Sequence, residues 1–105
     1  MENTAESQQR KQERNLDGRS RLCRVILHSD EITPMEFVVR VLQRFFQLTH
    51  PTATEVMYNA HFHGTAYVQT LPREAAQSRI SLARFAAGIE NYPLTFSTEA
   101  EESGS

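Results

Sequence analysis

Three neighbouring polar residues, Ser29, Asp30 and Glu31, directly precede a long apolar run and place two carboxyl groups close to a hydroxyl group. Asp30, Glu31 and His61 could form the acid–base set of a small hydrolase, because carboxylates and imidazoles are common proton carriers in enzymes. No motif for an activated nucleophile or an oxyanion site accompanies them in the sequence. The alternative is a structural role, in which the two acids complement the positive N-terminal end of the helix that follows.

The histidines raise a second chemical interpretation, a metal site. His61 and His63 form a His-x-His pair, and His28 and Cys23 stand elsewhere in the chain. An isolated pair of this kind is a weak signal for zinc, which usually takes three or four protein ligands. We therefore expect neither a metal ion nor another cofactor.

The acidic loop should be positioned by a helix that begins directly behind it. Thr33, Pro34 and Glu36 fit the N-cap, N1 and N3 positions of a capping box, in which the hydroxyl and the carboxylate each bond to a backbone N–H. An apolar stripe at helical spacing follows. It consists of Met35, Val38, Val39, Leu42, Phe45 and Phe46. Methionines at such spacing, here Met35 and farther on Met57, ordinarily belong to a hydrophobic core.

A second, shorter helix is predicted over residues 50–63. Thr49 would cap its start, and Gly64 would end it. His61 follows Met57 by four residues, so the two side chains project from the same side of the helix. The apolar face of this helix is made of Ala53, Val56, Met57 and Ala60.

Three strands and a third helix complete the expected fold. The segments RLCRVILH, TAYVQTL and LTFST have the composition of strands. Pro72 opens a helix between the last two segments. The apolar residues of that helix are Ala75, Ile80, Leu82, Ala83, Phe85, Ala86 and Ile89. The order β-α-α-β-α-β predicts an α+β fold, with three helices packed on a small three-stranded antiparallel sheet.

The length and composition of the chain fit one small domain. It has 105 residues, of which 39% are hydrophobic and 23% are charged. Residues 1–20 contain almost no large apolar side chain, so we expect them to form a disordered tail. The folded domain should span residues 21–99, and residues 100–105 should form a flexible C-terminal end.

The composition also excludes several kinds of partner. Cys23 is the only cysteine, so no intramolecular disulfide can form, and no apolar stretch reaches membrane-spanning length. The formal net charge is −2, and the clustered basic stripe of a nucleic-acid footprint is absent from the sequence. We therefore expect a protein of a reducing, aqueous compartment that binds neither nucleic acid nor a membrane.

Three blocks of the sequence stand out together: VILHSDEITPMEFVVRVLQRFF, ATEVMYNAHFHGTA and NYPLTFSTE. A T-P-M-E-F-V block after an acidic loop, followed by Met-x-x-x-His-x-x-Gly and a late Pro-Leu pair, is much more specific than any one block. In this order and at this spacing, the blocks resemble the ClpS adaptor family. The resemblance covers residues 21–99, the whole expected domain.

The resemblance implies an adaptor without catalytic activity. Such a protein binds N-degrons, which are proteins with a large hydrophobic residue at the free N-terminus, and delivers them to an AAA+ unfoldase and protease of the Clp type. The implied partner is the unfoldase N-terminal domain, of the ClpA or ClpC type. We accordingly expect a monomer in the bacterial cytoplasm, in preference to the plastid stroma.

Carried over residue by residue, the resemblance implies a site in two parts. The α-amine of the substrate would be bound by Ser29, Asp30, Glu31 and His61. The first side chain would enter an apolar hole shaped by Thr33 and lined by Met35, Val38, Met57, Ala60 and Leu94. Met35 would act as a gatekeeper that disfavours β-branched first residues.

On the third helix, Glu74 and Arg79 match the charged contacts that the family makes with the unfoldase. Exposed charges on a helix are otherwise usually just solvated. Three pocket positions depart from the family pattern: Ser29 replaces asparagine, Glu31 replaces aspartate, and Ala60 replaces valine or another larger apolar residue. The alternative function is therefore a ClpS-like interaction module, for example one that acts on the ribosome or on Clp, with lost or altered N-degron binding.

Overall fold

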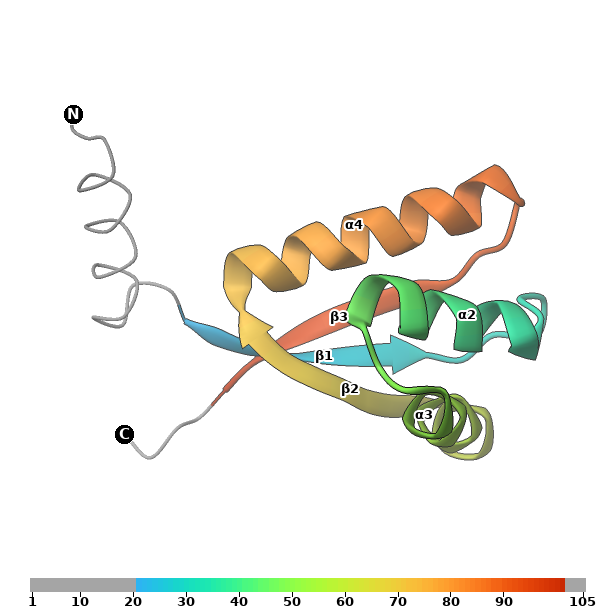
Figure 1. The fold of residues 1–105 in the computed structure, drawn as a ribbon, viewed down its shortest axis with the longest axis horizontal. Helices are drawn as coiled ribbons and strands as arrows, with labels where there is room; N and C mark the ends of the chain where they lie inside the picture. Colours follow the sequence, from blue (N-terminus) through green and yellow to red (C-terminus); the bar gives the residue numbers. More distant parts are fainter. Residues whose placement is uncertain (1–20, 102–105) are drawn as a thin grey trace.

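The computed structural model describes residues 21–101 and places three helices against a three-stranded sheet (Figure 1). The elements are β1 (Leu22–His28), α2 (Met35–Phe46), α3 (His50–His63), β2 (Thr65–Pro72), α4 (Arg73–Ile89) and β3 (Thr95–Ala100). This order confirms the predicted β-α-α-β-α-β fold. The tail expected over residues 1–20 and the chain end from residue 102 lie outside the described residues. None of the described helices combines the length and apolar character needed to cross a membrane.

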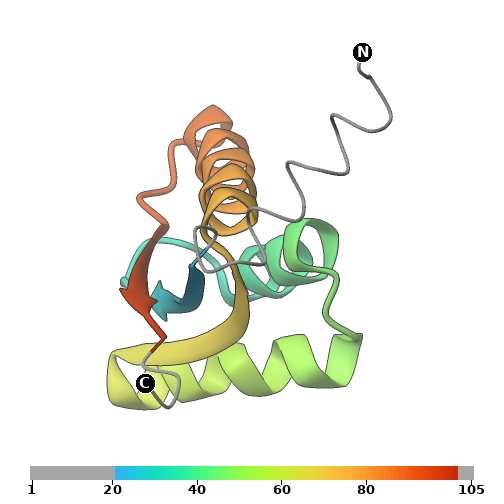
Figure 2. The ribbon, with the colours of Figure 1, turned by 90° about the vertical axis from the view of Figure 1, so that its left-hand side faces the viewer.

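β1 forms the centre of the sheet and pairs antiparallel with both β2 and β3. The helices lie to one side of the sheet (Figure 2). β3 extends two residues farther than expected, because Arg24 and Cys23 of β1 pair with Glu99 and Ala100. Ala100, expected in the flexible C-terminal end, therefore belongs to the sheet.

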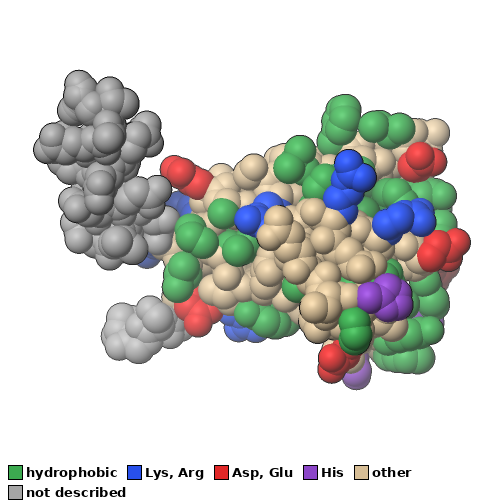
Figure 3. All heavy atoms as spheres, viewed as in Figure 1, with side chains coloured by type: hydrophobic (Ala, Val, Ile, Leu, Met, Phe, Trp, Pro, Cys, Tyr) green, Lys and Arg blue, Asp and Glu red, His purple; other side chains and the backbone are tan. Residues whose placement is uncertain are grey.

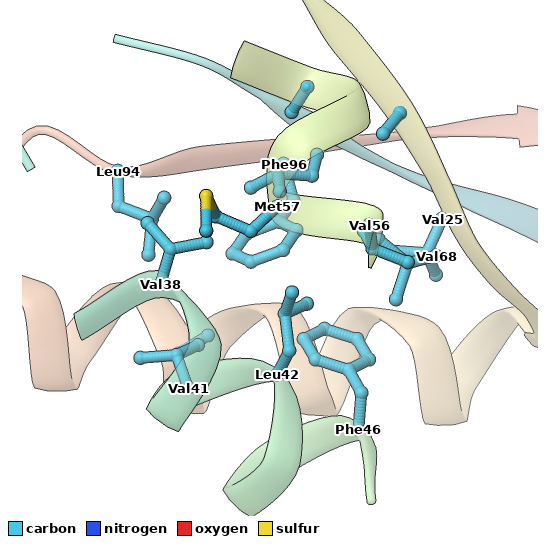
Figure 4. Close-up of a cluster of buried hydrophobic side chains, with 14 of the residues drawn as sticks. Val25, Val38, Val41, Leu42, Phe46, Val56, Met57, Val68, Leu94 and Phe96 are labelled. Atoms are coloured by element: carbon cyan, nitrogen blue, oxygen red, sulfur yellow. The ribbon is translucent and has the colours of Figure 1, made fainter. Parts of the chain in front are cut away.

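The core lies between the sheet and the helices. Its largest fully buried side chains are Val25 and Leu27 from β1 and Leu42 and Phe46 from α2. The Phe46 ring packs against Phe96 of β3, with the ring centroids 5.2 Å apart (Figure 4). The apolar stripe predicted for α2 thus supplies much of the core and fixes this helix against the sheet.

The capping box predicted at the start of α2 is wrong. Pro34 occupies the N-cap position, no side chain caps the helix, and Glu36 is exposed in the first turn. The Thr33 hydroxyl instead donates to Oδ2 of Asp30 over 2.9 Å. The acidic side chain therefore competes successfully with the helix end for the threonine hydroxyl.

The limits predicted for α3 are confirmed. The Thr49 side chain accepts a hydrogen bond from the backbone N–H of Thr52, and Gly64 ends the helix at φ +92°. This φ lies in the left-handed region, where glycine avoids the strain that a Cβ would cause. The Gly64 carbonyl accepts from the backbone N–H of Ser29 over 2.9 Å. This bond ties the end of β1 to the end of α3.

The apolar residues of α4 fall into two groups. One group is buried against the sheet and the neighbouring helices, and consists of Ala76, Ile80, Ala83 and Ala87. The other group is exposed: Leu82, Phe85 and Ile89 keep 51%, 70% and 66% of their surface accessible. Helix α4 therefore carries a second apolar stripe that has no partner within the described chain.

Candidate functional site

The predicted site residues surround a hollow of about 320 Å³, a volume that includes the part open to solvent. It lies where the end of β1, the start of α2, the end of α3 and the approach to β3 meet. Its lining residues are Leu27, His28, Ser29, Asp30, Thr33, Met35, Val38, Met57, Ala60, His61 and Leu94. Every residue predicted for the amine and apolar parts of the site is among them, except Glu31.

Asp30 organises the loop at one lip of the hollow. Its Oδ1 accepts from the backbone N–H groups of Ile32 and Thr33, over 2.8 and 2.6 Å. Its Oδ2 accepts from the Thr33 hydroxyl. An ionised carboxylate offers about four lone-pair positions, so one position on Oδ2 is left for another donor.

The environment of Asp30 also sets its charge. Burial raises the pKa of this carboxyl group, but hydrogen bonds from the Thr33 and Ile32 backbone and from the Thr33 hydroxyl favour the ionised form more strongly. The net effect is a pKa below the ordinary value of 3.8. Asp30 is therefore an anion at neutral pH and a weak proton acceptor. This property suits binding of a cation better than general base catalysis.

The other two residues of the acidic triplet differ in position. Ser29 is exposed at the lip of the hollow. Glu31 is exposed too, but it does not line the hollow. The structure thus brings Ser29 and Asp30 to the hollow and leaves the carboxylate of Glu31 outside it.

His61 faces the hollow from the last turn of α3. Its exposed ring meets the Phe62 ring edge-on, with the centroids 5.0 Å apart. Among residues 21–101, no hydrogen bond to either ring nitrogen is found, so this part of the chain leaves both nitrogens open to a ligand. No partner within the described chain therefore fixes the tautomer of this ring.

Buried apolar side chains form the floor of the hollow. Val38, Met57, Ala60 and Leu94 are each at most 8% exposed and belong to the core cluster. Figure 4 shows Leu94, Val38 and Met57 together at one end of that cluster. Met35, by contrast, is 39% exposed and stands at the mouth. Since the floor is continuous with the close-packed core, its shape is held before any ligand arrives.

Two lining residues were missed by the sequence interpretation, Leu27 and His28. Leu27 is fully buried behind the floor, and the His28 ring bonds through Nε2 to the Ser97 hydroxyl over 2.7 Å. The signal was available, because both residues end the predicted strand directly before the acidic loop. The last residues of such a strand must border whatever site the loop forms.

The metal interpretation gains no support from the described chain. Within residues 21–101, no three side chains of histidine, cysteine, aspartate or glutamate gather closely enough to hold a metal ion. Cys23 is buried in the core. The His63 ring bonds through Nδ1 to the Asn59 carbonyl over 3.2 Å.

The two residues predicted to contact the unfoldase have different surroundings. Glu74 is exposed in the first turn of α4. Arg79 is half-buried and donates through a guanidinium nitrogen to the Phe45 carbonyl, over 3.4 Å, in the last turn of α2. A cation at a helix C-terminus is favoured by the helix dipole. Arg79 therefore has a structural role between two helices that the sequence did not reveal.

Comparisons with known proteins identify a consistent set of similar chains. The family model described as "ATP-dependent Clp protease adaptor protein ClpS" matches residues 18–97. Over 84 residues the chain is 42% identical to the adapter protein ClpS 1 of Rhodopseudomonas palustris, covering 80% of this chain and 82% of that protein. Over 81 residues it is 41% identical to ClpS of Ruegeria pomeroyi, covering 77% of this chain and 72% of that protein.

A solved structure is similar as well. It is the structure of Agrobacterium tumefaciens ClpS2 bound to L-phenylalaninamide, with a TM-score of 0.75 and 36% sequence identity. The match covers 79% of this chain and 100% of that chain.

Proposed function

Since this chain belongs to the ClpS family of adaptors of the ATP-dependent Clp protease, we propose that its hollow binds the free N-terminus of proteins whose first residue is large and hydrophobic. The observation that carries the proposal is the pairing of polar acceptors at the lip with a buried apolar floor. A free N-terminus has the matching form, because a cationic amine, with a pKa of roughly 7.7–8.0, sits directly beside the first side chain.

Three groups at the lip are proposed to bind the amine. An ammonium group has three donors. Its acceptors would be the free lone pair on Oδ2 of Asp30, the Ser29 hydroxyl and one ring nitrogen of His61. Glu31, which lies outside the hollow, would add negative charge near its mouth without touching the ligand.

The apolar floor is proposed to bury the first side chain. Removing such a side chain from water contributes about 1.5–3 kcal/mol. The ligand of the Agrobacterium relative, L-phenylalaninamide, has this same chemistry, a free amine next to a benzyl side chain. Met35 at the mouth would exclude β-branched side chains by shape.

A panel of short peptides that differ only in the first residue tests the proposal. Fluorescence anisotropy should give clear binding for Phe, Tyr, Trp and Leu, and much weaker binding for Ile, Val and Ser. Equal affinities across the panel would reject the proposal and favour the alternative, a ClpS-like module that no longer recognises N-degrons.

We further propose that the protein acts as a monomer in the bacterial cytoplasm, without catalysis, and passes its ligand to a Clp unfoldase of the ClpA or ClpC type. Docking would use the N-terminal domain of the unfoldase and the start of α4, where Glu74 is exposed. Arg79 remains part of the proposed interface, but its bond to Phe45 makes it a poor test residue, since a change there disturbs the helix packing.

Glu74→Lys tests the docking surface without that complication. Co-elution with the isolated N-terminal domain should be lost, while affinity for a Phe-initiated peptide stays unchanged. Glu55→Lys makes the same charge change at an exposed position of α3 and should leave both activities intact. If Glu74→Lys co-elutes with the N-terminal domain as well as the wild-type protein does, this part of the proposal is rejected.

A further inference from the structure

A second hollow lies between α2 and α4, on a surface that the proposed N-degron site does not use. It encloses about 640 Å³, including the part open to solvent, and shares no lining residue with the first hollow. We name it the α2–α4 groove. Its lining residues are Phe37, Arg40, Val41, Arg44, Phe45, Leu82, Phe85, Ala86 and Ile89.

Each wall of the groove is an apolar stripe at helical spacing. The α4 wall is formed by Leu82, Phe85 and Ile89, at positions i, i+3 and i+7, all of them more than half exposed. The α2 wall is formed by three residues at positions i, i+4 and i+8, namely Phe37, Val41 and Phe45. At 1.5 Å per residue, the stripes run about 10–12 Å, the length of two helical turns.

Two exposed arginines give the groove a positive rim. Arg40 and Arg44 are one helical turn apart on α2, with their guanidinium groups 5.9 Å from the Phe37 ring centroid and 5.6 Å from that of Phe45. No acidic residue lines the groove, and within residues 21–101 neither arginine forms a salt bridge. In Figure 3, basic side chains stand among hydrophobic ones over the part of this face where α2 and α4 lie.

We propose that the α2–α4 groove docks an amphipathic helix of a partner protein, with apolar anchors flanked by acidic residues. Two apolar stripes that enclose a groove match the i, i+4, i+7 anchors of a helix laid between them. The charges of Arg40 and Arg44 select acidic flanks by complementarity. Arginines and aromatic side chains are also the residue types that contribute most to protein interfaces.

Other occupants fit this surface less well. Residues 1–20 of the chain contain almost no large apolar side chain and have as many basic as acidic residues, so they offer neither anchors nor negative charge. A second copy docked about a two-fold axis would present the same groove lining, which contains no acidic residue to meet the arginines. A membrane surface would meet a concave groove that it cannot fill.

The proposal is tested with a synthetic helical peptide of about 14 residues, stapled on its outer face, with Leu at positions i, i+4 and i+7 and flanking Glu. The peptide is acetylated, so it carries no free amine for the first hollow. We expect saturable binding in the micromolar range by anisotropy, weakened by salt. Phe85→Ser should weaken it at least about tenfold, and so should Arg40→Glu combined with Arg44→Glu.

Arg84→Glu is the matched control, because Arg84 is exposed on α4 but does not line the groove. It should leave affinity for the helical peptide unchanged, and all variants should bind a Phe-initiated peptide normally. Undiminished binding by Phe85→Ser, or equal binding of a peptide with Lys in place of Glu, would overturn the proposal. So would a wild-type dimer in sedimentation that Phe85→Ser dissociates, or binding to phosphatidylglycerol vesicles that this variant loses.

Discussion

Ala60 controls the width of the proposed N-degron pocket, and Ala60→Val should change which first residue binds best. Ala60 is 3% exposed and lines the hollow beside Met57 and Leu94. Compared with valine, its small side chain should leave more room for a flat aromatic ring and make fewer contacts with a slimmer leucine. Valine adds two methyl groups, and a buried methyl or methylene group contributes about 0.8 kcal/mol. Only part of that added surface reaches the ligand. The binding free energy of a Leu-initiated peptide should therefore improve by on the order of 1 kcal/mol relative to a Phe-initiated one, which is about fivefold in affinity.

The assay is a competition titration of Phe-initiated and Leu-initiated peptides, followed by fluorescence anisotropy. The Phe-to-Leu affinity ratio should fall about fivefold in Ala60→Val, in line with the free-energy difference above. Ala75→Val, at a half-buried position of α4 outside the hollow, should leave the ratio unchanged. A ratio that stays the same in Ala60→Val, or shifts further toward Phe, would refute the reasoning. Met57 and Leu94 would then already fill the space beside Ala60.

Three further predictions follow from the loop, the helix end and the pocket mouth. Asp30→Ala should lower the free energy of unfolding at pH 7 by about 1–3 kcal/mol. The pKa of Asp30 is lower in the folded state than in the unfolded state. Urea titrations should therefore find the full stability difference at pH values above the unfolded-state pKa, and should lose it as the pH falls through the folded-state pKa. Gly64→Ala should cost about 1–2 kcal/mol in the same assay, because φ is +92° there although a Cβ would meet no atom within 4 Å. Met35→Ala should raise the affinity for Ile-initiated peptides several-fold relative to that for Phe-initiated ones. An unchanged ratio of the two affinities would show that Met35 is not the gatekeeper.

Much of the pocket could be predicted because its residues lie at recognisable points of the chain. The strand end, the helix start and the residues around Met57 and His61 carry strong local patterns, and antiparallel pairing brings them to one end of the sheet. The loop itself was not predicted correctly. Thr33 resembles an N-cap in sequence, but Asp30 three residues earlier takes its hydroxyl, and local patterns do not rank two such competing hydrogen bonds.

The exposed stripe of α4 marks another limit of sequence reasoning. Leu82, Phe85 and Ile89 have the spacing of a core stripe, and periodicity alone cannot tell a buried stripe from an unpartnered one. The bond from Arg79 to the Phe45 carbonyl was equally hidden, because it joins residues 34 positions apart. Such contacts depend on how helices pack, which the local pattern of one helix does not specify.

The most direct test of the central claim compares a Phe-initiated peptide with its acetylated form. Acetylation removes the cationic amine and leaves the side chain intact. The acceptors at the lip, which a bound peptide covers, then lose their donor at about 1–3 kcal/mol. Titration calorimetry should give an affinity at least about fivefold weaker for the acetylated peptide, and His61→Ala should reduce the difference between the two peptides. Equal affinity of the wild-type protein for the free and acetylated peptides would contradict the account.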